Sequence, residues 1–325
     1  MGNNDHDGKR SNRTLATVII AAWRAEDVIA RSINSALEQN VGSLEVIVAD
    51  DASQDGTGDR VRAMMAEDSR IRYTRLERNG GPGAARNAAL SMARGDWIAV
   101  LDSDDQMAPG RLARIIALAE RVSADAVYDD LQPVDPAGVP LGPSHLDAQA
   151  ITEPERWTLE RFLAGCLALP GQSALGYLKP VLRRAFVEDI RLHYDETLRN
   201  GEDFHLMAEF LAQGGALWFT PEPGYLYTRR GGSVSARLDP SHARALALAD
   251  RNFGLRHGAR LSGTARDLLR QRRRNLADLS GAERAITALR DGHFGTAAGV
   301  LIQRPRTALR VLRQVGEGLW RRFRA

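Results

Sequence analysis

Residues 97–105 have the sequence WIAVLDSDD, in which five apolar residues are followed directly by three carboxylates and a serine. An apolar run that ends in polar residues is typical of a strand buried on both faces of a sheet. Two earlier stretches have a similar form, residues 17–23 (TVIIAAW) and residues 44–51 (LEVIVADD). In open α/β sheets, ligands bind outside the carboxyl ends of the strands. We therefore predict that these three strand ends meet at one edge of a sheet and form a ligand site.

Helical patterns alternate with these strands and determine the predicted fold class. Strands are predicted at 17–20, 44–49, 71–76 and 97–101, and helices at 26–38, 55–67 and 83–93. This order is typical of an α/β fold with a mostly parallel sheet, helices on both faces and right-handed crossovers. After a long loop at 132–155, we predict helices at 156–168 and 202–213, short strands at 217–220 and 225–227, and helices from residue 241 onward.

The composition is that of a folded globular protein. The chain has 325 residues, of which 43% are hydrophobic and 26% charged. Its one cysteine, Cys166, cannot form an intrachain disulfide, which favours a reducing cytoplasm. No apolar run reaches the roughly 18 residues that span a bilayer, and we interpret the apolar run ending at Trp23 as a strand rather than a signal peptide. We expect a disordered segment at 1–13, a nucleotide-binding domain at 14–237 and a helical, Arg-rich extension at 238–325.

Positive charge is concentrated in the last quarter of the chain. From residue 251 onward there are 17 arginines, no lysine and 5 acidic residues, although the net charge of the whole chain is only +3. Such asymmetry indicates an anionic partner, either a membrane surface or nucleic acid. Between residues 306 and 324, arginines alternate with apolar residues at near-helical spacing. This pattern predicts a helix on an anionic membrane surface, or equally one packed on the catalytic domain.

Two acidic clusters have the right chemistry for a nucleotide and a cation. Asp50 and Asp51 follow a strand and can accept hydrogen bonds from a base imide or a ribose hydroxyl; the alternative is that Asp51 or Ser53 caps the next helix. Asp102 and Asp104 are spaced by one residue, which suits a hard divalent cation such as Mg²⁺ or Mn²⁺ beside a diphosphate. The alternative for this second cluster is an acidic helix start before Pro109.

Three further segments can contact an anionic substrate or serve as a base. The Gly-rich turn of residues 79–87 brings Arg86 within reach of a diphosphate, unless Arg86 lies on a solvated helix face. It is neither a dinucleotide-binding nor a Walker A sequence. Arg229 and Arg230 stand in a basic, Gly-containing loop that can close over a diphosphate, or form a plain surface loop. Asp203 opens a helix and can act as a general base, although a helix cap explains its spacing as well.

Taken together, these segments resemble the family 2 inverting glycosyltransferases of the GT-A fold. The similarity covers about residues 14–237 and rests on VIIAAW at 18–23, DDAS at 50–53, the Arg86–Asn87 pair, LDSDD at 101–105 and GED at 201–203. Three later stretches, 177–180, 199–204 and 225–235, are similar to bacterial succinoglycan-type exopolysaccharide glucosyltransferases. The chain has Ala21-Ala22-Trp23 where relatives read Pro-Ala-Tyr. No Gln-x-x-Arg-Trp motif follows Asp203, which argues against a processive polymerase.

The resemblance implies a function and a set of roles. A hexose, glucose above all, would move from a UDP-sugar to a hydroxyl of a saccharide acceptor, linked to a polyprenyl diphosphate, in exopolysaccharide or cell-surface polysaccharide biosynthesis. The enzyme would be cytoplasmic and peripheral on the inner face of the membrane, with no nucleic-acid partner. Asp203 would be the catalytic base, and Asp104 with Asp102 would hold Mg²⁺ or Mn²⁺. The predicted nucleotide-sugar contacts are Ala21, Ala22, Trp23, Glu26, Asp50, Asp51, Arg86, Asp102, Ser103, Arg229 and Arg230.

Two other functions compete with this interpretation. A sugar-nucleotide pyrophosphorylase shares the nucleotide-binding α/β layout, but its Gly-rich loop after the first strand is missing here. A nucleic-acid binder with a basic tail is the non-enzymatic alternative, although the first 250 residues are acidic overall and carry no recognised nucleic-acid module.

Overall fold

The computed structural model describes residues 14–146, 151–169, 172–229, 240–304, 306–308 and 311. The chain divides into two compact units. Unit 1 consists of Met1–Thr158 and Gly176–Gly231, and unit 2 of Leu159–Leu175 and Gly232–Ala325. The domain boundary predicted between residues 237 and 238 lies outside the described residues, and so does the segment 1–13.

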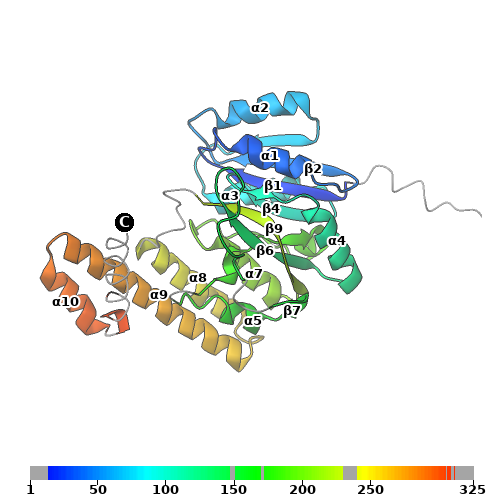
Figure 1. The fold of residues 1–325 in the computed structure, drawn as a ribbon. Helices are drawn as coiled ribbons and strands as arrows, with labels where there is room; N and C mark the ends of the chain where they lie inside the picture. Colours follow the sequence, from blue (N-terminus) through cyan, green and yellow to red (C-terminus); the bar gives the residue numbers. More distant parts are fainter. Residues whose placement is uncertain are drawn as a thin grey trace, which may run out of the picture. The chain divides into compact units, whose positions relative to one another are not determined.

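Unit 1 contains a nine-stranded sheet in the order β3-β2-β1-β4-β8-β6-β9-β5, with β7 paired to β9. Figure 1 shows the neighbouring strands β2, β1 and β4 of this sheet. The long strand pairs, β1 with β2 and β4, β2 with β3, and β6 with β9, are parallel. The antiparallel pairs involve the short strands β5, β7 and β8. The strands are β1 (Ala16–Ala22), β2 (Leu44–Asp50), β3 (Ile71–Arg75), β4 (Trp97–Asp102), β5 (Gln106–Met107), β6 (Ala126–Val134), β7 (Glu155–Trp157), β8 (Val181–Arg183) and β9 (Leu217–Thr228).

Helices follow most strands of unit 1, and the predicted α/β class with a mostly parallel sheet is confirmed. The helices of this unit are α1 (Ile29–Leu37), α2 (Thr57–Glu67), α3 (Pro82–Met92), α4 (Arg111–Val122), α6 (Arg184–Asp189) and α7 (Glu202–Ala212). The apolar runs in β1, β2 and β4 are buried almost throughout, as expected for central strands covered on both faces. The four strands and three helices predicted up to residue 101 all exist, with ends that differ by a few residues.

One predicted helix and two predicted strands in the second half of the chain were wrong in detail. The helix predicted at 156–168 is the strand β7 followed by the short helix α5 (Leu159–Ala164). Trp157 stacks on Phe219 of β9 with ring centroids 4.7 Å apart, and this long-range contact decides the strand. The two strands predicted at 217–220 and 225–227 are one strand, β9. A register shift against β6 accommodates the prolines between them, which cannot donate ladder hydrogen bonds.

Unit 2 is helical in its described part and contains α5, α8 (Pro240–His257), α9 (Gly263–Arg290) and α10 (Phe294–Gln303). Ser262 caps α9 by accepting a hydrogen bond from the Ala265 amide at 3.0 Å. Arg272 is buried in α9, where it pairs with Asp250 at 3.2 Å and donates to the Cys166 carbonyl. Among the described helices, none combines the length and apolar character needed to cross a bilayer.

A buried polar cluster around Glu45 connects the amino-terminal ends of the strands β1, β2 and β4. Glu45 accepts hydrogen bonds from the Thr17 hydroxyl and the Arg94 amide, each at 2.7 Å, and pairs with Arg72 at 2.8 Å. Burial alone would raise the pKa of Glu45, but the hydrogen bonds from Thr17 and Arg72 outweigh it and lower the pKa. Ionised Glu45 therefore stabilises the fold above its unfolded pKa of about 4.3, and this contribution is lost as the pH falls through the folded pKa.

Glu45→Gln is expected to lower the free energy of unfolding at pH 7 by about 1–3 kcal/mol, because its amide group faces donors that need an acceptor. The difference from wild type should shrink as the pH falls below about 4. Urea unfolding at pH 7 and pH 3 measures both effects. Glu67→Gln, an exposed change on α2, is the control and should be nearly neutral. A wild-type advantage of equal size at both pH values would contradict the assignment.

Candidate active site

The carboxyl ends of three neighbouring strands lie level with one another. In the strand register Ala22 pairs with Asp50 across β1 and β2, and Ala21 pairs with Asp102 across β1 and β4. The predicted convergence of the three clusters at one sheet edge is therefore present in unit 1. Parallel pairing produces this arrangement because parallel strands end at the same edge.

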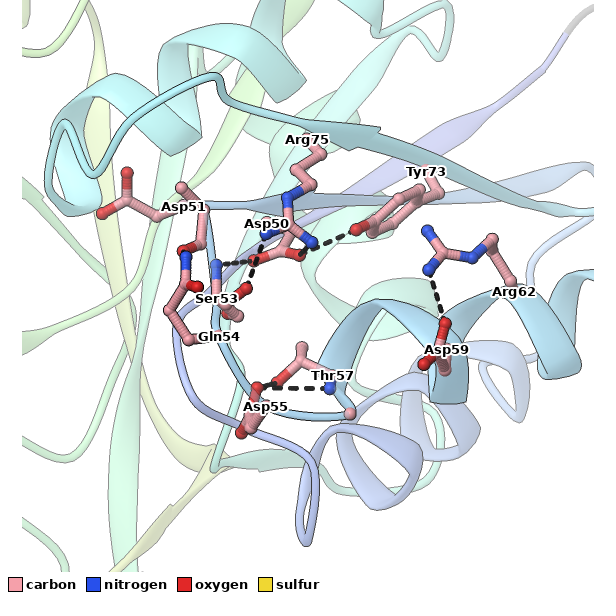
Figure 2. Close-up of polar contacts among 12 residues, drawn as sticks. Asp50, Asp51, Ser53, Gln54, Asp55, Thr57, Asp59, Arg62, Tyr73 and Arg75 are labelled. Atoms are coloured by element: carbon pink, nitrogen blue, oxygen red, sulfur yellow. Dashed lines mark hydrogen bonds and ion pairs between the residues drawn. The ribbon is translucent and has the colours of Figure 1, made fainter.

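Asp50 and Asp51 point in different directions from the end of β2 (Figure 2). Asp50 is fully buried and accepts hydrogen bonds from the Ser53 amide at 2.9 Å and the Tyr73 hydroxyl at 2.7 Å. Arg75 lies 3.8 Å from the same carboxylate and donates to the Ser53 carbonyl. These contacts connect Asp50 to the loop after β2. The contact of Asp50 with a nucleotide base stays a prediction.

Asp51 connects the end of β2 to the Gly-rich turn before α3. Its two carboxylate oxygens accept hydrogen bonds from the amides of Gly80 at 2.6 Å and Gly81 at 2.8 Å. Gly81 has a φ of 89°, which favours glycine because a side chain is strained there. Neither Asp51 nor Ser53 caps α2, whose first residue is Thr57 and whose N-cap is Gly56. The helix-cap alternative for these two residues therefore fails.

The loop after β1 carries the predicted nucleotide-sugar contacts Trp23 and Glu26. Trp23 is 50% exposed, and the Arg24 guanidinium lies over its ring at 4.9 Å. The loop is held against the β2–α2 connection, since the Ser53 hydroxyl accepts from the Arg24 amide at 3.0 Å and Glu26 accepts from the Gly56 amide at 2.9 Å. The loop therefore presents an exposed indole at the sheet edge, and an aromatic face of this kind can stack on a base.

Arg86 occupies the centre of a buried charge cluster rather than a solvated helix face. Its guanidinium is 4% exposed and contacts Asp102 at 2.6 Å, Glu202 at 2.6 Å and Asp203 at 3.2 Å. Burial by itself lowers the pKa of Arg86, but the neighbouring carboxylates, above all Asp203, raise it well above its usual value. The cluster brings the end of β4 together with the start of α7. A contact between Arg86 and a diphosphate stays a prediction.

Lys179 is the second cation of this cluster, and sequence analysis assigned it no role. Its ammonium group lies 2.6 Å from Asp203 and 2.9 Å from Asp102. Burial by itself lowers the pKa of Lys179, but Asp102 and Asp203 raise it above the ordinary value. In the same way burial opposes ionisation of Asp102, yet Lys179 and Arg86 keep the pKa of its carboxyl far below the usual range. The carboxylate of Asp102 therefore stays charged.

A buried ion pair holds the backbone of Lys179 in place. Arg111 is fully buried and contacts both carboxylate oxygens of Asp129, at 2.8 and 2.7 Å. The same guanidinium donates to the Lys179 carbonyl at 3.0 Å. Because the bidentate pair is rigid, the Lys179 side chain starts from a defined position.

Asp203 lies in the first turn of α7. Gly201 precedes the helix with a φ of 76°, a conformation that glycine adopts without strain. Glu202 and Asp203 then place two carboxylates at the positive end of the helix dipole. No side chain caps the helix through a hydrogen bond, so the cap alternative does not describe Asp203.

The loop after β4 is fixed by contacts from two elements, α1 and β9. The Ser32 hydroxyl of α1 donates to the carbonyls of Ser103 at 2.8 Å and Asp105 at 2.6 Å. Asp105 is buried and accepts from the Tyr225 hydroxyl at 2.8 Å and the Thr228 amide at 2.7 Å. Burial first, and then the charges of Asp102 and Asp104, raise the pKa of Asp105 well above its usual value. The loop that carries Asp104 is therefore tied to both α1 and β9.

Asp104 is half-buried in this loop, and the donor set around it fits a shared cation site. In the described part of the chain, no three His, Cys, Asp or Glu side chains are grouped so that they can hold a metal by themselves. Mg²⁺ is ordinarily held by one or two carboxylates together with substrate phosphates and water. Asp104 suits that arrangement, and Asp102, two residues earlier, also contacts Arg86 and Lys179 through its carboxylate oxygens.

The remaining predicted contacts lie at the end of β9 and in the tail. Arg229 is exposed, and its amide donates to the Val134 carbonyl at 2.8 Å. Arg230 lies outside the described residues, as does most of the basic segment 306–324.

Glu202, Asp105 and Tyr225 also had no predicted role. Glu202 lies in the motif GED and Asp105 in the motif LDSDD, so both residues stand in recognised motifs although no function was predicted for them. Tyr225 accepts a hydrogen bond from the Asp102 amide at 3.1 Å, a contact across 123 positions that no local pattern predicts.

Comparison with known proteins agrees with this geometry. The sequence model of a family described as "Glycosyl transferase family 2" matches residues 17–175. Succinoglycan biosynthesis protein ExoO of Rhizobium meliloti is 40% identical over 262 residues, which cover 81% of this chain and 74% of that protein. Succinoglycan biosynthesis protein ExoU of the same organism is 34% identical over 294 residues, covering 90% and 84%. A UDP-Glc:alpha-D-GlcNAc-diphosphoundecaprenol beta-1,3-glucosyltransferase of Escherichia coli, WfgD, is 27% identical over 197 residues, covering 61% and 70%.

Solved structures show the GT-A fold. The chain superposes on Staphylococcus aureus TarS 1–349 in complex with UDP-GlcNAc with a TM-score of 0.60 at 19% identity, covering 88% of this chain and 90% of that one. It superposes on the mannosyltransferase PcManGT of Pyrobaculum calidifontis, in complex with GDP-Man and Mn²⁺, with a TM-score of 0.59 at 18% identity, covering 96% and 82%.

Proposed function

Because the chain belongs to glycosyl transferase family 2 and is a glycosyltransferase, we propose that it transfers a hexose from a UDP-sugar to a saccharide hydroxyl with inversion. Glucose is the proposed sugar. The transferase assignment replaces the pyrophosphorylase alternative. The observation that carries the proposal is the buried cluster in which Lys179 and Arg86 join Asp102, at the end of β4, to Asp203, at the start of α7.

The proposed reaction is a single in-line displacement. The acceptor oxygen attacks the anomeric carbon and forms the new glycosidic bond. The bond from that carbon to the diphosphate oxygen breaks, and UDP leaves with the electron pair. Asp203 takes the proton of the acceptor hydroxyl. An α-linked donor therefore yields a β-linked product. Lys179 and Arg86 hold the carboxylate of Asp203 in a fixed position at 2.6 and 3.2 Å.

The proposed cofactor is Mg²⁺ or Mn²⁺, held by Asp104 and assisted by Asp102. A divalent cation at this position supplies charge neutralisation for the leaving diphosphate. The nucleoside would lie over the loop after β1, near Trp23 and the β2–α2 connection. Arg229 and Arg230, beyond the end of β9, would contact the diphosphate.

The names of the relatives support the proposed pathway and acceptor. ExoO and ExoU are named for succinoglycan biosynthesis, and WfgD for transfer of glucose to a GlcNAc-diphosphoundecaprenol. We accordingly propose a role in bacterial exopolysaccharide biosynthesis with a saccharide acceptor linked to a polyprenyl diphosphate. The association of the basic segment 306–324 with an anionic membrane surface remains a prediction from the sequence.

Donor binding is expected to depend on the metal and on Asp104. UDP-glucose at about 100 times its Kd should add about 2.7 kcal/mol to the free energy of unfolding when Mn²⁺ is present. The stabilisation by UDP-glucose should fall sharply in EDTA. In Asp104→Asn this stabilisation should be the same with and without Mn²⁺. Thermal shift with a panel of UDP- and GDP-sugars, with and without Mn²⁺, measures both and also tests the donor.

Asp59→Asn, which changes an exposed carboxylate on α2, is the matched control and should respond like wild type. Equal stabilisation by UDP-glucose with Mn²⁺ and with EDTA would contradict the metal role. Stabilisation by a GDP-sugar alone would contradict the proposed donor.

A further inference from the structure

An exposed aromatic residue lies on the segment that leads to the charge cluster. Leu175 and Leu178 are fully buried, but Tyr177 between them is 45% exposed. Tyr177 ends the short 3₁₀ helix Leu175–Tyr177, and Lys179 follows two residues later. The proposed mechanism makes no use of this ring.

The ring of His145 lies against Tyr177, although 32 positions separate the two residues in the sequence. The ring centroids are 6.0 Å apart and the ring planes meet at 74°, an edge-to-face contact. The backbone of His145 is fixed to the end of β6, because its amide donates to the Leu131 carbonyl at 2.8 Å. The next residue, Leu146, is buried, and its amide donates to the Asp130 carboxylate at 3.1 Å.

Tyr177 lies two residues before Lys179, a member of the charge cluster. Burial raises the pKa of the Tyr177 hydroxyl, Tyr227 raises it further, and the positive charge of Lys179 opposes the rise. The positive charge of Lys179 thus acts on the Tyr177 hydroxyl. Lys179 in turn contacts Asp203 at 2.6 Å.

Sheet order separates this aromatic pair from the nucleoside side of the site. Trp23 and Asp50 follow β1 and β2, on one side of β4. Tyr177 precedes β8 and His145 follows β6, and both of these strands lie on the other side of β4. Asp102, at the end of β4, and Asp203 stand between the two sides. Tyr177 and His145 therefore belong to the β8 and β6 side of the sheet, away from the predicted nucleoside contacts.

We propose that Tyr177, supported by His145, forms the acceptor subsite and stacks against the apolar face of a pyranose ring in the saccharide acceptor. This inference rests on the proposed function, in which Asp203 accepts the proton of the acceptor hydroxyl. Tyrosine suits the task because it offers a large, rigid contact area and loses little conformational entropy on binding. The edge-to-face contact with His145 orients the ring before the sugar arrives.

The test compares kinetic constants for the two substrates. The donor is UDP-glucose with Mn²⁺, and the acceptors are glucose, galactose and N-acetylglucosamine, each linked to citronellyl diphosphate. Tyr177→Ala is expected to raise the acceptor KM about tenfold or more, with the donor KM changed by less than about twofold. Tyr177→Phe keeps the ring, so its acceptor KM should stay within about twofold of the wild-type value. His145→Ala should raise the acceptor KM by a smaller factor.

Controls separate this proposal from the one it rests on. Phe294→Ala removes a ring that is 68% exposed in unit 2 and should leave both KM values unchanged. Hydrolysis of UDP-glucose without acceptor should be the same in Tyr177→Ala and wild type. A raised donor KM, or an unchanged acceptor KM, in Tyr177→Ala would overturn the subsite.

Further outcomes decide the proposed function. Wild-type protein that hydrolyses UDP-glucose but glycosylates none of the three lipids would overturn the acceptor class and this subsite with it. Wild-type protein that neither hydrolyses nor transfers glucose would overturn the proposed donor instead. A melting temperature of Tyr177→Ala within about 2 °C of wild type shows that the variant is folded.

Discussion

Replacing Asp203 by Asn is expected to lower kcat by about 10²–10⁴-fold, the usual contribution of a general base. Asn keeps the shape of the side chain, and its amide oxygen can still accept the hydrogen bond from Lys179, which lies 2.6 Å away in the wild type. The donor KM should therefore change by less than about twofold. Steady-state kinetics at saturating acceptor measures both constants, and isothermal titration with UDP-glucose and Mn²⁺ checks donor binding.

The neighbouring carboxylate provides the matched control. Glu202 is also buried in the first turn of α7 and also contacts Arg86, at 2.6 Å. Glu202→Gln removes one negative charge from the same cluster without removing the proposed base, so kcat should fall far less than in Asp203→Asn. Equal losses in the two variants would show that cluster charge, not proton transfer, explains the effect. Wild-type turnover in Asp203→Asn would refute its role as the base.

Replacing Arg86 by Met is expected to lower the free energy of unfolding at pH 7 by about 3–5 kcal/mol. Arg86 is 4% exposed and contacts three carboxylates, and after its loss Lys179 alone remains to balance them. Removing one partner of a buried ion pair leaves charges that neither water nor a counterion stabilises. Chemical denaturation at pH 7 measures the loss. Arg86→Lys keeps the charge but not the planar guanidinium, so its free energy of unfolding should lie between those of wild type and Arg86→Met.

The same variant should show a distinct pH dependence. In the wild type burial alone would raise the pKa of Asp102, but Lys179 and Arg86 keep it far below the usual range. Ionised Asp102 therefore stabilises the wild type above its unfolded pKa of about 3.9, and this contribution is lost as the pH falls. The difference in unfolding free energy between wild type and Arg86→Met should narrow in acid, because Asp102 without Arg86 can take up a proton.

An exposed arginine serves as control for the charge change itself. Arg70 pairs with Asp68 at 2.7 Å, and its side chain is 45% exposed. Arg70→Met should cost no more than about 1 kcal/mol, since exposed ion pairs contribute little. A loss in Arg86→Met as small as that in Arg70→Met would contradict the view that the cluster is desolvated.

The first half of the fold could be predicted because its local patterns carry the information. The strands β1, β2 and β4 are runs of apolar residues that only a doubly covered strand explains, and helical periodicity separates them. The short strands β5, β7 and β8 have two or three residues each, too few for a period to be visible. Their pairing with β9, β6 and β4 comes from tertiary contacts.

The candidate site divides in the same way. The strand-end carboxylates Asp50, Asp51, Asp102 and Asp104 were found from the sequence, because parallel strands end at one edge and polar residues after an apolar run are conspicuous. The partners of these carboxylates were not found. The contact of Arg86 with Glu202, across 116 positions, was not predicted, and its contact with a diphosphate stays a prediction. Lys179 had no assigned role, and Asp50 proved to be fully buried among Ser53, Tyr73 and Arg75.

The sequence by itself thus determined the α/β class, the family and the sheet edge at which the carboxylates gather, since these follow from local periodicity and from short motifs in a fixed order. Only the tertiary structure decided which charges neutralise one another, and that Tyr177 and His145 meet beside Lys179. The physical reason is that the protonation state and position of a buried charged group depend on the groups within a few ångströms of it. Folding brings those groups from distant parts of the chain.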